Sequence, residues 1–156
     1  MGESVTSGIS SIDGVLLTLL KIVNVSGGDV LHGMKRSDPG YSDFGEAYFS
    51  IIESGVVKAW KRHKNMTLNL VVPLGAVRFV IYDDRANSKS NGKYQEVILS
   101  RGNYYRMTVP PMVWMGFQGI DVNTSMLLNI ADIEHEPDEA DRKEIIEINY
   151  DWEFIK

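Results

Sequence analysis

The chain of 156 residues contains no cysteine and only three histidines. Without cysteine there can be no thiol nucleophile, disulfide framework, iron–sulfur cluster or Cys-ligated zinc. Imidazole nitrogens are scarce as well. Any metal site in this chain would therefore have to be nearly free of cysteine and histidine ligands.

Positive charge is also in short supply, because 16 Lys and Arg residues face 21 Asp and Glu residues, for a net charge of -5. This balance argues against a broad surface for nucleic acid or for an anionic membrane. It still permits a local basic pocket for a phosphorylated ligand. We therefore expect neither nucleic acid nor a membrane as a partner.

Long hydrophobic runs are missing. The most apolar early stretch, residues 14–25, contains Lys21 and Asn24, and no basic segment precedes it as in a signal peptide. Nowhere do about 18 apolar residues follow one another, the minimum for a membrane-spanning helix. The expected location is the cytoplasm.

The composition that remains is globular, with 44% hydrophobic and 24% charged residues, and we expect a single domain over residues 1–156. Short segments rich in Val, Ile, Tyr, Phe and Thr alternate with turn residues, which predicts an all-β sandwich or barrel. The first of these segments is also compatible with a helix. The expected strands are 15–23, 47–53, 56–63, 67–72, 76–82, 94–99, 104–109 and 125–130.

Three other segments carry local signals. Residues 33–45 are dense in turn residues and predict an exposed loop. Asp83, Asp84 and Arg85 begin a polar run and predict a structural turn with an ion pair. Pro137 followed by acidic residues and helix formers predicts a short C-terminal helical segment.

The spacing of particular residues resembles the cupin superfamily of small barrels. The frame of its first signature is present at Gly55, Lys61, His63, Leu68 and Gly75, and the second is approximated by Gly102, Pro110 and Met115. Metal-binding cupins use three imidazoles and one carboxylate, and only His63 of these ligands remains. The resemblance therefore favours a cupin without a metal.

Within the cupins, the chain resembles the dTDP-4-dehydrorhamnose 3,5-epimerase family from about Gly14 to Trp152. GVVKAWK at residues 55–61 is similar to the family's GVLRGLH, and NLV at 69–71 to its KLV. DDR at 83–85, LS at 99–100, VPP at 109–111 and GF at 116–117 match further blocks in the same order.

This resemblance implies an antiparallel jelly-roll β-barrel that acts on a nucleotide-linked 4-keto-6-deoxy sugar without a cofactor. The ketone acidifies the neighbouring C3 and C5 protons, so a base on one face and an acid on the other can invert each centre through an enolate. It also implies a homodimer in which residues 1–25 are exchanged as an N-terminal strand.

The residues at the reacting centre depart from the family. Its base falls at Lys61, its enolate-stabilising lysine at Asn69, and its tyrosine on the opposite face at about Leu128. The histidine of its second signature falls at Met115. A non-catalytic relative that binds a sugar nucleotide is therefore the alternative to an epimerase or isomerase.

In an active protein, Lys61 or His63 would be the base, since both side chains share a face of one strand. Burial would lower the pKa of Lys61 and provide a neutral amine. Lys58 would contact the diphosphate if the strand is bulged near Ala59. Tyr48, Tyr104 and Tyr105 are the candidate acids.

Structural roles compete with these assignments. Lys58, Lys61, Arg62 and Lys64 could form a solvated strand face. Trp60 is expected in the core, whereas Trp114 could lie in the core or stack on the substrate. The candidate substrate-binding residues are Lys58, Tyr48, Asn69, Trp114 and Met115, and no role is assigned to His32 or His135.

Overall fold

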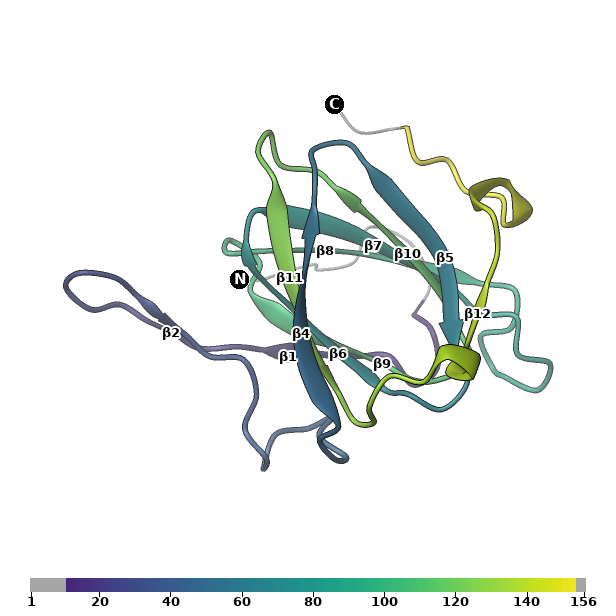
Figure 1. Cartoon of the computed structure of the whole chain (residues 1–156), viewed down its shortest axis with the longest axis horizontal. Helices are drawn as coiled ribbons and strands as arrows, with labels where there is room; N and C mark the ends of the chain where they lie inside the picture. Colours follow the sequence, from purple (N-terminus) through teal and green to yellow (C-terminus); the bar gives the residue numbers. More distant parts are fainter. Residues whose placement is uncertain (1–10, 154–156) are drawn as a thin grey trace.

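A computed structural model describes residues 11–153 as two facing antiparallel sheets (Figure 1). One, here called the β4 sheet, has the order β1 (Leu16–Leu19), β9 (Tyr105–Val109), β6 (Leu68–Leu74), β11 (Ser125–Ala131) and β4 (Glu46–Ile52). The other, the β5 sheet, has the order β12 (Ala140–Arg142), β5 (Val57–His63), β10 (Trp114–Gly119), β7 (Ala76–Tyr82) and β8 (Tyr94–Ser100). The expected all-β jelly-roll architecture is confirmed.

The sequence pattern missed three strands, the short β3 (Val30–Leu31) and β12 and the central β10. β10 lies between β5 and β7 in the middle of its sheet. Gly116 and Gly119 weaken its strand signal, because glycine has a low β-propensity. Gly116 is required by packing, since a Cβ there would lie 2.6 Å from the Cβ of Ala59.

The C-terminal helical segment is reduced to two short 3₁₀ turns, η1 (Pro137–Glu139) and η2 (Ile145–Glu147), on either side of β12. Pairing with β5 overrides the helix signal there. Lys64 donates its amide proton to the carbonyl of Glu139, and Trp60 and Lys143 exchange two backbone hydrogen bonds of 3.1 Å. The segment is thereby held on the edge of the β5 sheet.

Two of the three hydrophobic clusters of the described residues pack against the β5 sheet, one on each of its faces. The larger lies between the sheets and includes Leu70, Phe79 and Met107. The second lies on the other face of the β5 sheet, where Trp60, Trp114 and Trp152 are buried with the C-terminal segment. Trp60 is therefore a core residue, as expected.

The N-terminal part of the described chain combines an edge strand with a protruding arm. β1 pairs with β9 of the same chain. β2 (Ile22–Val23) and β3 (Val30–Leu31) form a hairpin that projects away from the two sheets (Figure 1). Residues 1–10 of the segment expected to be exchanged lie outside the described residues, so the exchange stays a prediction.

No helix within residues 11–153 is long and apolar enough to cross a membrane.

Candidate active site

A cavity of about 580 Å³ lies between the two sheets at the side where β4 and β12 are the edge strands. The β4 sheet contributes apolar side chains, among them Leu68, Leu70 and Leu127, together with three polar ones, Tyr48, Ser50 and Asn129. The opposite wall is formed by Lys58, Lys61, His63, Met115 and Phe117, and by residues 142–144 and Glu147 of the C-terminal segment. The cavity thus combines an apolar interior with a few charged groups from β5 and β12.

His63, at the end of β5, is fixed by a buried carboxylate. Its Nδ1 lies 2.7 Å from Oε1 of Glu139 in η1. Because an ionised carboxylate only accepts hydrogen bonds, Nδ1 carries the proton and Nε2 keeps its lone pair. Burial lowers the pKa of His63 below its ordinary value, although the hydrogen bond with Glu139 opposes this shift. A neutral imidazole of this kind can act as a general base.

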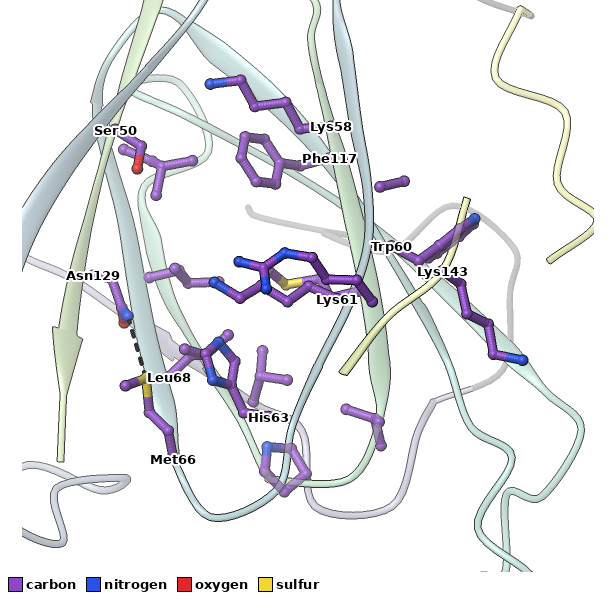
Figure 2. Close-up of a pocket in the computed structure, with 18 of the residues that line it drawn as sticks. Ser50, Lys58, Trp60, Lys61, His63, Met66, Leu68, Phe117, Asn129 and Lys143 are labelled. Atoms are coloured by element: carbon purple, nitrogen blue, oxygen red, sulfur yellow. Dashed lines mark hydrogen bonds between the residues drawn. The ribbon is translucent and has the colours of Figure 1, made fainter. Parts of the chain in front are cut away.

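Lys61 lies two residues before His63 and lines the same cavity, between Lys58 and His63 in Figure 2. Burial lowers the pKa of the Lys61 ammonium, and the positive charge of Arg142 lowers it further. Arg142 is the residue of β12 that pairs directly with Lys61. The cavity therefore holds two neighbouring cations close to the imidazole.

The bulge that Lys58 requires is present in β5. Lys61 pairs with Met115 and Lys58 with Phe117, so the single residue Gly116 stands opposite two residues of β5. The extra residue turns Lys58 to the same face as Lys61, although the two lie three positions apart. The Nζ of Lys58 donates a 3.0 Å hydrogen bond to the carbonyl of Ile51 on β4.

Of the three candidate acids, only Tyr48 lines the cavity. Its hydroxyl accepts a 3.1 Å hydrogen bond from Nδ2 of Asn129, the residue paired with it on β11. The hydroxyl of Tyr104 donates instead to the carbonyl of His32, and Tyr105 packs against the main core. Tyr48 thus faces β5 from the opposite sheet.

Two of the expected substrate-binding residues do not line the cavity. Asn69 alternates with the cavity-lining Leu68 and Leu70, so its side chain lies on the other face of β6, where it donates to the carbonyl of Gly40. Trp114 lies on the outer face of β10 and donates from Nε1 to Asp84. Met115, the next residue of β10, does line the cavity.

Leu128, at the expected position of the family's tyrosine, is also absent from the cavity wall, because its neighbours Leu127 and Asn129 point inward. The ion pair between Asp83 and Arg85 is present at 2.8 Å. Burial would raise the pKa of Asp83, but hydrogen bonds from Arg85, Ser88 and Ser90 lower it strongly.

Sequence reasoning missed Glu139, Asn129 and Arg142. Glu139 lies 76 residues from His63, in a segment that was expected to be helical. Apart from Ser125 at its start, Asn129 is the one polar residue of β11, and a polar residue on the inward face of such an apolar strand could have indicated a site. Arg142 became a cavity residue only through the pairing of β12 with β5.

Within residues 11–153, no group of three or more His, Asp or Glu side chains is placed to hold a metal ion. The site residues that do converge are acid–base and cationic groups, which suit proton transfer and the binding of an anionic ligand.

Comparison with known proteins agrees with this architecture. No protein-family model matches the chain. A solved dTDP sugar isomerase from Desulfovibrio desulfuricans G20 is 36% identical, covers 93% of this chain and 94% of its own, and superposes with a TM-score of 0.89. The dTDP-4-dehydrorhamnose 3,5-epimerase of Elizabethkingia anophelis has the same fold at 16% identity, with a TM-score of 0.78 over 97% of this chain and 88% of its own.

A curated relative, the probable low-salt glycan biosynthesis epimerase of Haloferax volcanii, is 31% identical over 100 residues. That match spans 64% of this chain and 64% of the relative. The similarity to the Desulfovibrio isomerase extends over nearly the full length of both proteins. The chain therefore belongs to the dTDP-4-dehydrorhamnose 3,5-epimerase family.

Proposed function

We propose that the protein is an epimerase or isomerase of a nucleotide-linked 4-keto-6-deoxy sugar, and that it works without a metal or other cofactor. The observation that carries this proposal is the buried pair of His63 and Glu139 at the wall of the cavity. The names of its relatives, a dTDP sugar isomerase and a glycan biosynthesis epimerase, support the substrate class.

His63 is the base in this mechanism. Its Nε2 removes the proton at C3 or C5, beside the C4 ketone, and the electron pair of the broken C–H bond forms a carbon–carbon double bond while the carbonyl π electrons move onto oxygen. Glu139 holds the ring in position and stabilises the imidazolium that results. His63 is preferred to Lys61 because it is already neutral and oriented.

Tyr48 is the acid. It extends from β4, whereas His63 extends from β5, so the two side chains approach a sugar in the cavity from opposite sheets. A proton delivered by Tyr48 to the carbon that lost one to His63 inverts that centre. Asn129 donates to the phenol oxygen and stabilises the charge that develops on it.

Lys58 contributes the contact with the diphosphate. Figure 2 places its side chain near Ser50 and Phe117, at the opposite end of β5 from His63. A sugar with its reacting carbons at His63 would therefore extend its diphosphate toward Lys58. The exposed ammonium is suited to a phosphate, for which Lys acts as a point charge.

The decisive test is a panel of nucleotide-linked 4-keto-6-deoxy sugars incubated in D₂O and followed by NMR. We expect deuterium uptake at C3, C5 or both with the wild-type protein, and none with His63→Asn. Lys64→Met, which removes an exposed cation beside the site, is the matched control and should exchange normally. Tight binding of the panel without any exchange would favour the non-catalytic relative instead.

A homodimer and a cytoplasmic location remain proposals. Support for the dimer comes from the outer face of β4, where Phe49 and Ile51 are 62% and 49% exposed. Light scattering of the wild type and of Phe49→Glu tests it, and a monomeric wild type would overturn it.

A further inference from the structure

We propose that Lys61 and Arg142 together hold the negatively charged oxygen that forms on the sugar ketone when His63 removes the neighbouring proton. This inference rests on the proposed proton-transfer function and adds Arg142, from the C-terminal segment, to its catalytic residues. It places the stabilising charge on the same side of the cavity as the base.

The geometry of the two cations carries the proposal. Lys61 on β5 and Arg142 on β12 are direct partners in an antiparallel pair, and both side chains line the cavity. Side chains at such positions lie on the same face with their Cβ atoms about 5 Å apart. One small anionic oxygen can therefore be contacted by both groups.

Neither cation forms an ion pair with a carboxylate within residues 11–153, although the charge of Glu139 partly offsets the fall in the pKa of Lys61. Within residues 11–153, the side chains of Lys61 and Arg142 make no hydrogen bond or ion pair. The nearby carboxylates are engaged elsewhere. Asp141 lies 2.7 Å from Arg62 on the outer face, and Glu139 is bonded to His63 and to two backbone amides. Glu144 and Glu147, which line the cavity, form the capping box of η2. Like charges at directly opposed positions destabilise a sheet, so the repulsion between Lys61 and Arg142 lowers the stability of the folded protein without substrate.

No other cation in the described cavity can take this role. The cavity-lining residues of the β4 sheet are apolar or neutral, and Asn69 points away from the cavity. Lys58 is bonded to the carbonyl of Ile51 at the far end of β5. Lys143 extends to the outer face, where its ammonium lies 5.2 Å from the centre of the Trp114 ring (Figure 2).

The apolar lining of the cavity strengthens the stabilisation of the negatively charged oxygen by these cations. Leu68, Leu70 and Phe117 line the cavity around the two cations. Lys61 is partly buried in this setting, whereas Arg142 is exposed to solvent. A fixed charge stabilises a developing negative charge far more in an apolar setting than in water, so Lys61 supplies the larger share of the stabilisation. Two preformed cations therefore lower the barrier to proton removal without any rearrangement at the moment of reaction.

The test compares Lys61→Met, Arg142→Met and Arg142→Lys with the wild type and with the control Lys64→Met. We expect kcat for deuterium exchange to fall by about 100-fold in each Met variant, with the Kd for the nucleoside diphosphate unchanged. Arg142→Lys should recover part of the loss. Both Met variants should unfold at an equal or higher temperature than the wild type, because each removes a repulsive charge.

The pH profile provides a second readout. Lys61 is faced by Lys58 and His63 on its own strand, and by Arg142, Glu139, Tyr48, Glu144 and Glu147 on other elements. If the Lys61 ammonium is the active form, activity falls as the pH rises through its lowered pKa. Removing Arg142 relieves repulsion and raises that pKa, so the alkaline limb should move to higher pH.

The outcomes separate this inference from the proposed function. A wild type that exchanges no proton in any sugar contradicts the function itself. A wild type that exchanges normally, with Met variants of unchanged kcat, contradicts only the inference. The Met variants could instead lose affinity for the nucleoside diphosphate by as large a factor as they lose kcat. That result would show that Lys61 and Arg142 bind the diphosphate, and it would also overturn the inference.

Discussion

Glu139 holds His63 with one carboxylate oxygen and the backbone with the other. Oε1 lies 2.7 Å from Nδ1 of His63, while Oε2 accepts the amide protons of Asn65 and Met66 at 2.8 and 2.7 Å. Both side chains of the pair are more than nine-tenths buried. The carboxylate is thus fixed before any substrate arrives, and it presents the unprotonated Nε2 of the imidazole as the remaining basic site.

Glu139→Gln should reduce kcat for proton exchange by about 100-fold or more, because the neutral amide neither fixes the tautomer of His63 nor stabilises its imidazolium. The measurement is deuterium uptake under saturating substrate. Glu136→Gln, three residues earlier and without a side-chain capping bond, serves as the control. Normal exchange in folded Glu139→Gln would remove the pair from the mechanism.

The acid limb of the pH profile should lie below pH 6.5, the ordinary pKa of histidine. Burial lowers the pKa of His63, and the cations of Lys61 and Arg142 lower it further. The base is active when deprotonated, so activity is lost as the pH falls through this lowered pKa. Glu139 opposes the shift, and Glu139→Gln should therefore move the limb to still lower pH. A limb above 6.5 would contradict this assignment.

Tyr48→Phe should separate exchange from inversion. His63 can still remove the proton and return a deuteron to the same face, so deuterium uptake continues while the product with inverted configuration is lost. NMR reports both quantities in one experiment. Tyr105→Phe, whose phenol lies outside the cavity, should leave both unchanged. Unimpaired inversion by Tyr48→Phe would show that another group is the acid.

Lys58→Met should weaken binding of the nucleotide without changing the chemical step. Loss of one charge-assisted contact with a phosphate raises Kd by about tenfold. Calorimetry with the nucleoside diphosphate alone measures this effect, and kcat at saturating sugar nucleotide should be retained. If kcat falls while Kd is constant, Lys58 acts at the reacting carbon instead.

The β architecture and part of the site could be predicted from the sequence, because strand alternation is a local property. The shared face of Lys61 and His63 follows from their spacing alone. Glu139 could not be found in this way, because its contact with His63 spans 76 residues and depends on how η1 docks on β5. The helix signal at Pro137 was real but local, and it was overridden by strand pairing.

Asn69 was assigned to the substrate site from the family resemblance. The alternation of inward and outward side chains along β6 would have placed it on the other face of the strand. Leu68 and Leu70 point into the cavity, so Asn69 between them cannot. Its Oδ1 accepts hydrogen bonds from Thr108 at 2.6 Å and from Arg106 at 3.2 Å. The residue therefore belongs to the buried network that fastens the loop over residues 33–45.

Restoring the family's lysine should consequently harm the protein rather than improve it. Asn69→Lys places an ammonium beside the fully buried guanidinium of Arg106 and removes the acceptor of Thr108. We expect the free energy of unfolding to fall by about 3 kcal/mol, with no gain in kcat per folded molecule. Urea denaturation measures the loss, and Asn24→Lys in the exposed β2–β3 hairpin is the control. A stable Asn69→Lys variant with raised kcat would mean that position 69 reaches the substrate after all.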